Sequence, residues 1–481
     1  MKDHLPKGWT TVRISELCDI TKQKGCEGIR PYLEIGNVDI ISKNYVFTQK
    51  PSVKGCRTAR RNDLLVSKVR PTRGAITFIR EDELQVSSAF TILRNRGALA
   101  EKYLWLYLAW NRDYLNHLGE RCTGTMYPTT SDNDVVEFDV PIPPLPGQRR
   151  IVERLEMLLR KVDTIRSRLE RIPTILKRFR QSVLVAASSG RLTADWRERN
   201  RHTEVASELL SQIKVLRMEA ALNAKEKKEI VRAFQPDMLT LTDDELLFNK
   251  IPDSWVACRI GAIGTVMNGS TPSRKRPEFW TGGIPWVSSG EVRNNIITAT
   301  RECITQEGYE SCSLRLLPRG TVLLAMIGEG KTRGQTAILN IEAAINQNIA
   351  AVLLTHGLIR PEILWRWFQL QYEATRERGG GSCPQALNCQ RVRELPFVLP
   401  PLPEQQEIVR RVEALFTLTD QIEARCAKAK VYVDKLTQSL LAKAFRGELV
   451  PQDPNDESAS VLLKRIKESR AQKPFKNIRR R

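Results

Sequence analysis

A long segment of this chain occurs twice, and the repeat constrains the fold more than any other feature. Residues 142–192 reappear without a gap as residues 399–449, 257 positions later. The first copy begins Ile-Pro-Pro-Leu-Pro-Gly-Gln and the second begins Leu-Pro-Pro-Leu-Pro-Glu-Gln. An internal repeat sets the architecture of a chain, so it is considered before any local pattern. The repeat indicates a chain built by duplication, with a two-sided function.

Within each copy, apolar residues recur in alternating steps of four and three, which is typical of coiled-coil helices. In the first copy the predicted seam consists of Ile151, Leu155, Leu158, Val162, Ile165, Leu169, Ile172, Leu176, Phe179 and Val183. In the second copy it consists of Ile408, Val412, Leu415, Thr419, Ile422, Cys426, Ala429, Val433, Leu436 and Leu440. We predict two long helices that pair with each other. The alternative is that each helix only docks on its own domain.

The two helices are expected to pack antiparallel, because this arrangement gives an approximate two-fold symmetry. The seam alone does not exclude parallel packing. At 1.5 Å per residue, each helix would extend roughly 60 Å. Pro173 lies inside the first helix, where the second helix has Lys430. Because proline lacks an N–H donor and clashes with the preceding turn, a kink is predicted there.

The chain has 481 residues, a formal net charge of +21 and a pI near 9.7. This length is too great for one core and suggests several domains. Such basicity favours nucleic acid as the partner, with an acidic membrane surface as the alternative. No apolar run approaches the length of a membrane span, and the first residues do not resemble a signal peptide. The cysteines and histidines are scattered, so no metal site is predicted and a cytoplasmic location is expected.

A region of mixed strands and helices precedes each long helix. The two regions begin alike, with Leu-Pro-Lys-Gly-Trp at residues 5–9 and Ile-Pro-Asp-Ser-Trp at residues 251–255. Short apolar runs separated by Gly, Asn and Pro follow, which is typical of short strands and turns. The predicted fold class is therefore α+β, with two tandem α/β domains separated by two long antiparallel coiled-coil helices. The predicted boundaries are 1–141 for the first domain, 142–192 for the first helix segment, 193–250 for a solvated connector, 251–398 for the second domain, 399–449 for the second helix segment, and 450–481 for a basic tail, which is typical of a disordered segment.

Two segments of the repeat resemble a known protein family. Residues 172–181 (Ile-Pro-Thr-Ile-Leu-Lys-Arg-Phe-Arg-Gln) and 440–449 (Leu-Leu-Ala-Lys-Ala-Phe-Arg-Gly-Glu-Leu) are similar to the two conserved helical regions of type I restriction–modification specificity subunits, with the enteric type IA branch as the nearest. The order of domain, Pro-Pro-Leu-Pro and helix, repeated twice, resembles this family over the whole chain. The resemblance implies two target recognition domains that each read half of a split DNA site, with the helices as a fixed spacer.

The resemblance also implies partners and cofactors. Two modification subunits, which bind S-adenosylmethionine and methylate adenine, are expected to dock on the chain. Restriction subunits, which use ATP and Mg²⁺ for translocation and DNA cleavage, are expected to join them. The chain itself is expected to bind no cofactor and to carry no catalytic residue. In agreement, the sequence contains no Asp/Asn-Pro-Pro-aromatic tetrapeptide of adenine methyltransferases. A pure assembly scaffold is the alternative without DNA reading.

The candidate DNA-binding residues are basic, amide and hydroxyl side chains between the predicted strands. Arg and Lys suit guanine and Asn or Gln suit adenine, whereas most protein–DNA hydrogen bonds go to phosphate and sugar. The first domain offers Lys22, Lys24, Arg57, Arg60, Arg61, Lys68, Arg70 and Arg73. The second domain offers Arg274, Lys275, Arg276, Ser288, Arg293, Lys331, Thr332, Arg333, Asn346, Gln347 and Asn348. The resemblance also places the loops at Gly124-Thr125 and at residues 379–382 near DNA.

Residues 325–332 (Ala-Met-Ile-Gly-Glu-Gly-Lys-Thr) satisfy a relaxed phosphate-loop pattern, which makes a nucleotide-binding enzyme another alternative. A phosphate loop needs a strand before it and a helix after it, whose N-terminus holds the phosphates. The residues that follow, Arg333 to Leu339, instead have the composition of a second strand. We therefore favour a hairpin tip that presents Lys331, Thr332 and Arg333 to DNA.

Overall fold

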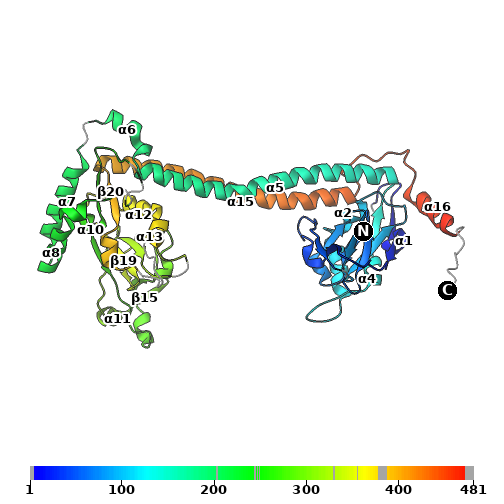
Figure 1. Ribbon diagram of the computed structural model, residues 1–481, viewed down its shortest axis with the longest axis horizontal. Coiled ribbons are helices and arrows are strands. Elements are labelled where there is room, and N and C mark those ends of the chain that lie inside the picture. The colour runs from blue at the N-terminus through cyan, green and yellow to red at the C-terminus, as the bar shows by residue number, and fades with distance from the viewer. Residues whose placement is uncertain are drawn as a thin grey trace. The chain divides into compact units, whose positions relative to one another are not determined.

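The computed structural model describes residues 5–51, 53–201, 204–242, 245, 248, 250–328, 331–354, 356–377 and 387–471. The chain forms two compact units, and Figure 1 shows the elements of each. The first unit combines Met1–Arg171 with Cys426–Arg481, and the second consists of Ile172–Arg425. Each unit therefore contains one mixed α/β domain and a part of both long helices.

The first domain contains two four-stranded sheets. One has the order β2 (Cys18–Thr21), β9 (Phe90–Asn95), β6 (Leu64–Ser67) and β7 (Ile76–Phe78). The other has the order β4 (Thr48–Lys50), β3 (Arg30–Leu33), β8 (Glu83–Val86) and β5 (Arg57–Arg60). A further pair joins β1 (Thr10–Arg13) to β10 (Asp139–Ile142), and the helices are α1 (Ile14–Leu17), α2 (Tyr103–Leu108), α3 (Arg112–Glu120) and α4 (Asp132–Val136).

Strand β6 shows how the first domain buries both faces of its sheet. Every residue of β6 is buried, as expected for a strand between two layers. Because successive side chains of a strand point to opposite faces, Leu64 and Val66 pack in the cluster that contains Leu104 of α2. Leu65 packs instead in the cluster that contains Leu33 of the second sheet. The first sheet is thus the central layer of the domain.

The second domain repeats this plan. Its larger sheet has the order β12 (Thr265–Asn268), β19 (Ile349–Leu353), β16 (Val322–Ala325), β17 (Thr336–Leu339) and β14 (Asn295–Ile297). Its smaller sheet has the order β15 (Glu302–Ile304), β13 (Ile284–Val287) and β18 (Ala344–Ile345). The remaining elements are β11 (Val256–Arg259) paired with β20 (Pro396–Leu399), α10 (Ile260–Ile263), α11 (Gln306–Glu310), α12 (Pro361–Leu370), α13 (Tyr372–Glu377) and α14 (Cys389–Arg393). The first four strands occur in the same order as in the first domain, which confirms the predicted duplication.

The repeated Pro-Pro-Leu-Pro segments start the long helices α5 (Leu145–Ser188) and α15 (Leu402–Phe445). The conserved glutamine of each copy, Gln148 or Gln405, is fully buried. The Gln148 amide donates to the carbonyls of Ala98 and Pro143 and accepts from the Ala100 N–H. Gln405 makes the equivalent three hydrogen bonds in the second unit. The repeat therefore anchors each helix to the domain that precedes it.

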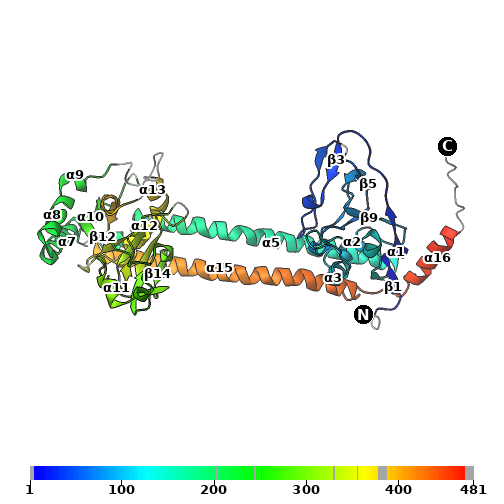
Figure 2. The same cartoon turned by 90° about the horizontal axis from the view of Figure 1, so that it is seen from below.

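Within each unit, α5 and α15 run side by side in opposite directions (Figures 1 and 2). In the first unit, Arg166 of α5 pairs with Asp434 at 3.1 Å, and the earlier residue Arg150 pairs with the later residue Asp456. In the second unit, Arg180 pairs with Asp420 at 2.6 Å. Beyond the end of α5, Asp195 pairs with Arg411, which precedes Asp420 on α15. The predicted antiparallel pairing is confirmed within each unit.

The seam of the helices departs from the predicted heptad at three positions. Most seam residues are buried or half-buried, whereas Ile165, Phe179 and Leu436 are exposed. On α15 the buried residues after Val433 are Thr437 and Leu441, which continue in steps of four. A straight helix has 3.6 residues per turn, so a 3.5-residue pattern drifts off the contact face. Those three seam assignments are therefore wrong. Helix α5 continues through Pro173, and the kink stays a prediction.

The predicted solvated connector instead packs on the second domain. It contains α6 (Ala194–Arg199), α7 (Ala206–Ala220), α8 (Ala224–Ala233) and α9 (Pro236–Leu239). In α7, Leu209 and Ile213 are buried in the core of the second unit. Arg217 of the same helix donates to the carbonyls of Gly261 and Ala262 at 2.6 and 2.8 Å. The apolar stripe of α7 therefore finds a partner distant in sequence, which explains the correction.

The tail also folds where it was expected to be disordered. Residues Ala459–Ala471 form α16, drawn in red in Figure 1. Ala459 is buried in the core of the first unit, and Leu463 and Ile466 pack against that core. The Ala459 N–H donates to the Gly8 carbonyl at 3.0 Å. Residues 472–481, the strongly basic end, lie outside the described residues.

A buried carboxylate joins three segments of the second unit. Glu404, near the start of α15, is 1% exposed. Its carboxylate accepts hydrogen bonds from the indole of Trp255 at 2.7 Å, the hydroxyl of Thr193 at 2.6 Å and the guanidinium of Arg197 at 2.5 Å. The equivalent position of the repeat in the first unit is Gly147. The second unit thus depends on a charged joint that the first unit does not share.

Candidate nucleic-acid interface

One end of the central sheet gathers most of the candidate residues of the first domain. Strand pairing places Thr21 of β2 opposite Ile92 and Ser67 of β6 opposite Phe90. Strands β2 and β6 therefore end where β9 begins, and the loops that follow them leave the sheet at the same end. These two loops hold the predicted residues Lys22, Lys24, Lys68, Arg70 and Arg73.

Asp132, the first residue of α4, lies at the centre of a group of cations. Its carboxylate is 3.0 Å from Nζ of Lys68, and 3.7 Å from both Nη1 of Arg57 and Nζ of Lys22. The carboxylate also accepts a hydrogen bond from the Thr91 hydroxyl at 2.7 Å. We call Lys22, Arg57, Lys68 and Asp132 the Asp132 cluster. Three cations around one anion leave a net positive site, which suits a phosphate backbone.

The carboxylate of the Asp132 cluster is ionised, and two of its three cations are half-buried. Burial raises the pKa of the Asp132 carboxyl, but the hydrogen bonds from Thr91 and Lys68 and the charges of Lys68 and Arg57 outweigh it. The pKa of Asp132 is therefore lower than its ordinary value, and the group is ionised at neutral pH. Lys68 and Arg57 are half-buried, whereas Lys22 is exposed. The cluster thus presents partly fixed cations at the sheet end.

Arg70 connects this sheet end to a hairpin at residues 123–129, which contains the predicted Gly124-Thr125 loop. The guanidinium of Arg70 lies over the ring of Tyr127, 4.9 Å from its centroid, and donates to the Met126 carbonyl at 3.4 Å. Thr129, at the base of the hairpin, forms a β-bridge with Val69. Tyr127 and Met126 are both exposed. The Gly124-Thr125 loop therefore lies beside the basic loop after β6.

Two candidates of the first domain lie elsewhere. Strand β5 runs from Arg57 to Arg60, so the two ends of this strand are roughly 10 Å apart. Arg57 belongs to the Asp132 cluster and Arg60 lies at the other end. Arg61 follows it and pairs with the exposed Asp82 at 2.8 Å. Arg60 and Arg61 are thus not brought together with the other candidates.

The corresponding end of the second domain gathers a different set. Strand pairing places Ala325 of β16 opposite Ile349 and Leu324 opposite Thr336. Strand β16 therefore ends where β17 and β19 begin. The two loops at this end hold the predicted residues Lys331, Thr332, Arg333, Asn346, Gln347 and Asn348.

The amide residues of the second domain have different surroundings. Asn346 is buried, and its side-chain oxygen accepts the N–H of Asn348 at 3.1 Å. Gln347 is exposed, and its side-chain oxygen accepts the Thr271 hydroxyl at 2.5 Å. Asn346 therefore shapes its loop, whereas Gln347 presents an amide to the surface. The carbonyl of Lys331 accepts the hydroxyl of Tyr372 at 2.8 Å, which fixes the neighbouring loop.

Arg274 and Arg276 are engaged in ion pairs within the second domain. The guanidinium of Arg274 pairs with Glu302 at 2.5 Å and stacks on Trp280 at 3.5 Å from the ring centroid. Arg276 pairs with Glu278 at 2.7 Å. Both arginines would have to leave these partners to contact DNA.

Three further candidates of the second domain differ in their engagement. The Ser288 hydroxyl donates to the buried Glu291 at 2.9 Å and completes a capping box. Arg293 lies two residues before the start of β14 and donates from Nε to the Gly290 carbonyl at 2.7 Å. Lys275 is exposed. Ser288 therefore has a local structural role, and Lys275 and Arg293 stay surface candidates.

The segment that resembles a phosphate loop lacks the required element order. Strand β16 ends at Ala325, Lys331 to Gly334 form a turn, and β17 begins at Thr336. Residues 329 and 330 of the motif lie outside the described residues. A strand thus stands where a phosphate loop needs a helix. The segment is a hairpin connection, as the sequence favoured.

Sequence reasoning missed Lys43. Its ammonium is buried and donates to the Gly74 carbonyl at 2.7 Å, and burial lowers the pKa of Lys43 to about 8. Its own carbonyl accepts the Thr77 hydroxyl at 2.8 Å. Lys43 therefore fixes the turn that carries Arg73. Its sequence neighbours, Ser42 and an asparagine, are typical of an exposed turn and give no signal of burial.

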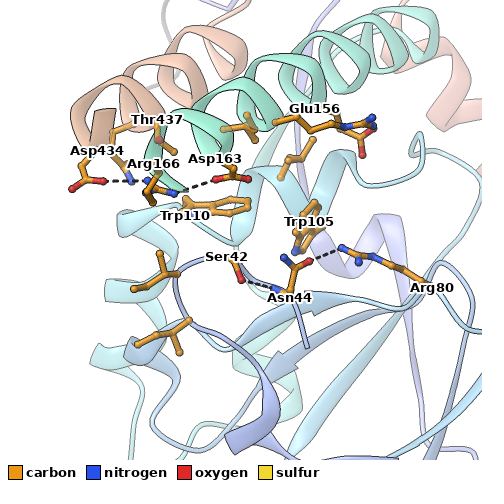
Figure 3. Close-up of a pocket in the computed structure, with 16 residues that line it drawn as sticks. Ser42, Asn44, Arg80, Trp105, Trp110, Glu156, Asp163, Arg166, Asp434 and Thr437 are labelled. Atoms are coloured by element: carbon orange, nitrogen blue, oxygen red, sulfur yellow. Dashed lines mark hydrogen bonds and ion pairs between the residues drawn. The ribbon is translucent and has the colours of Figure 1, made fainter. Parts of the chain in front are cut away.

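A cavity of about 320 Å³ lies in the first unit between the first domain and the long helices (Figure 3). Ile40, Ile41 and Trp105 line it from the domain side. On the helix side, Arg166 reaches across to Asp434. No residue of the Asp132 cluster lines this cavity, so it is part of the joint between domain and helices.

Within the part of the chain that the structure describes, no helix has the length and apolar character needed to cross a bilayer. The loop at residues 379–382, which the resemblance places near DNA, lies outside the described residues. The geometry thus leaves two basic or amide-rich sheet ends, one in each domain, as the candidate interface.

Comparison with known proteins assigns the chain to a family. Residues 6–174 and 252–430 both match the family described as "Type I restriction modification DNA specificity domain". The chain is 29% identical to the type I restriction enzyme EcoDI specificity subunit of Escherichia coli over 75% of each chain. It is 27% identical to the StySPI specificity subunit of Salmonella potsdam over 97% of this chain and 96% of that one.

The fold is also shared with a solved structure. The crystal structure of the HsdS subunit from Thermoanaerobacter tengcongensis aligns with a TM-score of 0.55 at 20% identity. The alignment covers 92% of this chain and 98% of that chain. Because both α/β domains match the family separately, the match agrees with the internal duplication. The chain therefore belongs to the family of type I restriction modification DNA specificity domains, as a specificity subunit.

Proposed function

We propose that this specificity subunit reads a bipartite, asymmetric DNA site, with one half-site for each domain. The observation that carries the proposal is that candidate residues gather at the same end of the same sheet in both domains. The formal net charge of +21 supports contact with a phosphate backbone. As a specificity subunit, the chain is a non-catalytic part of a type I restriction–modification complex.

The chemistry of the two sheet ends differs, which supports two unlike half-sites. The first domain presents the Asp132 cluster and Arg70, so lysine and arginine dominate. The second domain presents Lys331 together with the amide of Gln347. Arg and Lys match the acceptors of guanine, whereas Asn and Gln match the donor–acceptor pair of adenine. The shared scaffold with divergent loops is what an asymmetric site requires.

Lys68→Ala tests the interface of the first domain. We expect weaker binding to the target duplex and to non-target duplexes, because Lys68 is placed to contact phosphates and not base edges. The slope of log affinity against log salt should fall by about 0.9 for the lost phosphate contact. Arg61→Ala is the matched control, because Arg61 is exposed and paired with Asp82 away from the cluster. An unchanged salt slope for Lys68→Ala would place the interface elsewhere.

The exposed apolar residues of the long helices support docking of two copies of one partner. In the second unit, Ile175 and Phe179 are 60% and 39% exposed on α5. In the first unit, Tyr432 and Leu436 are 72% and 45% exposed on α15. The repeat aligns these pairs, since 257 positions separate Ile175 from Tyr432 and Phe179 from Leu436. Residues four apart lie on one helix face, so each unit presents an equivalent apolar pair.

We infer that these pairs are docking positions for the two modification subunits that the family resemblance implies. Contiguous exposed apolar patches mark interaction sites on proteins, and these pairs occur at equivalent positions in both units. S-adenosylmethionine would bind to the modification subunits, and ATP and Mg²⁺ to the restriction subunits that join the assembly. The complex would act where bacterial DNA lies, in the cytoplasm. A pure scaffold would use the same helix positions but would bind DNA without sequence preference.

Introduction of negative charge at each apolar pair tests this docking. Tyr432→Asp with Leu436→Asp should remove one modification subunit, and Ile175→Asp with Phe179→Asp should remove the other. Loss of an apolar anchor at the centre of an interface weakens binding by roughly 30-fold or more. Native mass spectrometry of the co-expressed subunits measures the stoichiometry. The exposed, repeat-related Ser182→Asp and Ser439→Asp serve as controls. Two bound modification subunits in both variants would contradict the docking positions.

A further inference from the structure

The Asp132 cluster contains a carboxylate, although a surface that binds phosphates would have a higher affinity for DNA without it. Asp132 is within 3.7 Å of three cations and is hydrogen-bonded to Thr91, so its carboxylate cannot turn away without breaking several contacts. Like charges repel, and a carboxylate in a site for DNA opposes the approach of phosphates. If the surface served only to attract DNA, the Asp132 carboxylate would lower its affinity for DNA. The arrangement therefore calls for another role.

The contacts of Asp132 restrict the long cationic side chains around it. A lysine or arginine side chain loses rotamer entropy when it is fixed, and both are among the side chains with the most to lose. Lys68 and Arg57 are half-buried and paired with the carboxylate. A cation held in place contacts phosphates only on a duplex that fits, whereas a mobile cation follows the backbone of any duplex. Fixed cations thus favour selectivity over general affinity.

Among the described residues of the second domain, the position equivalent to Asp132 is not acidic. The 257-residue offset of the repeat, extended back to the short helix before it, relates Asp132, which follows the cap residue Ser131 of α4, to Cys389, which follows the cap residue Asn388 of α14. Cys389 is half-buried, and burial raises the pKa of its thiol, so this position carries no anion at neutral pH. The second domain therefore serves as a control within the same chain for any effect of the carboxylate on the first half-site.

We propose that Asp132 is a positioning residue for DNA selectivity, which restrains Lys22, Arg57 and Lys68 and penalises loosely fitting DNA. The proposal rests on the proposed function of the first domain as a DNA reader. It adds that an acidic residue in the interface lowers the affinity for non-target DNA more than the affinity for the target. Thr91 takes part by fixing the carboxylate through its hydroxyl.

The test uses Asp132→Asn in the full chain assembled with its modification partner. The probes are two duplexes of equal length, one with the motif identified by sequencing of methylated DNA and one scrambled. We expect roughly fivefold tighter binding to the scrambled duplex from the removal of one anion near the phosphates. Because target binding should tighten less than scrambled binding, the ratio of target to scrambled affinity should fall about threefold, a small part of the usual specificity ratio. Single base changes should lose their effect in one half-site only.

Asp82→Asn is the matched control, because it makes the same change in net charge on the same domain outside the cluster. If Asp82→Asn lowers the selectivity ratio as much as Asp132→Asn, the proposal is overturned. A changed base preference at a single position in Asp132→Asn also overturns it, since Asp132 would then read a cytosine directly. An unchanged ratio overturns it as well.

Thr91→Val provides a second route that leaves the charge intact. The variant removes the hydroxyl that fixes Asp132 and keeps the side-chain volume, so we expect a partial fall in selectivity. If thermal unfolding shows that Asp132→Asn is not folded, the selectivity ratio of Thr91→Val tests the proposal in its place. Failure of the proposed function is recognised separately, because Lys68→Ala would then leave the affinity of the first domain for DNA unchanged.

Discussion

Replacing Glu404 by alanine should destabilise the second unit by roughly 3–5 kcal/mol, the largest stability effect expected of a single substitution in this chain. The carboxylate is buried and accepts hydrogen bonds from Trp255, Thr193 and Arg197. Its removal leaves the guanidinium of Arg197 without its counter-charge and the indole of Trp255 without an acceptor. Breaking one partner of a buried pair is costly because the remaining charge stays desolvated.

Thermal unfolding followed by hydrogen exchange measures this effect. For a unit of this size, the expected change corresponds to a fall in midpoint of about 10 °C. Exchange should accelerate in the second unit, whereas the first unit, which has Gly147 at the equivalent position, should keep its protection. Glu413→Ala, an exposed carboxylate on the same helix, should change the stability by less than about 0.5 kcal/mol. Equal behaviour of Glu404→Ala and Glu413→Ala would show that the joint contributes nothing.

The pairing of the long helices could be predicted because the heptad pattern is local. Residues such as Leu155 and Val412 fall on one helix face by spacing alone, and both are buried. Ile165, Phe179 and Leu436 satisfied the same spacing and are exposed, because the contact face of a straight helix drifts away from a 3.5-residue repeat. Two of these three residues belong to the aligned apolar pairs that we assign to partner docking.

The connector and the tail show what local patterns miss. Leu209 and Ile213 lie on one stripe of α7, a pattern that indicates a docked helix without saying where it docks. Their polar neighbours gave the segment the composition of a solvated linker. Helix α7 packs against α10, which begins at Ile260, about forty residues later in the chain. Helix α16 contacts Gly8, at the opposite end of the chain. Contacts of this kind follow from the tertiary fold alone.

The candidate interface was predicted in part. Lys22, Lys68 and Arg57 were named as basic residues in loops, but only strand register places them at one sheet end. The sequence does not point to Asp132, because an aspartate after a serine is typical of a helix N-terminus. Asp132 is indeed the first residue of α4. Arg274 was named for its charge and is paired with Glu302. The sequence shows which charged residues are present, but only the tertiary fold shows which of them form ion pairs.

Exchange of the second domain should change one half of the DNA site completely and leave the other half unaltered. The replaced segment, residues 251–400, runs from the start of the second domain to the second Pro-Pro-Leu-Pro segment. Each domain is anchored to its own helix by a buried glutamine, Gln148 or Gln405, so the helix pair should keep the spacing of the half-sites. Centres of two half-sites on one face of the duplex are expected about one helical turn, roughly 10 bp, apart.

Sequencing of methylated DNA is the measurement that tests the two-domain reading most directly. The parent chain and the chain with an exchanged second domain are each expressed with the modification subunits, and the methylated motifs are compared. We predict one new half-site, one unchanged half-site and the same number of unread base pairs between them. A motif altered in both halves, or with a different spacing, would contradict the claim that the two domains read DNA independently on a fixed spacer.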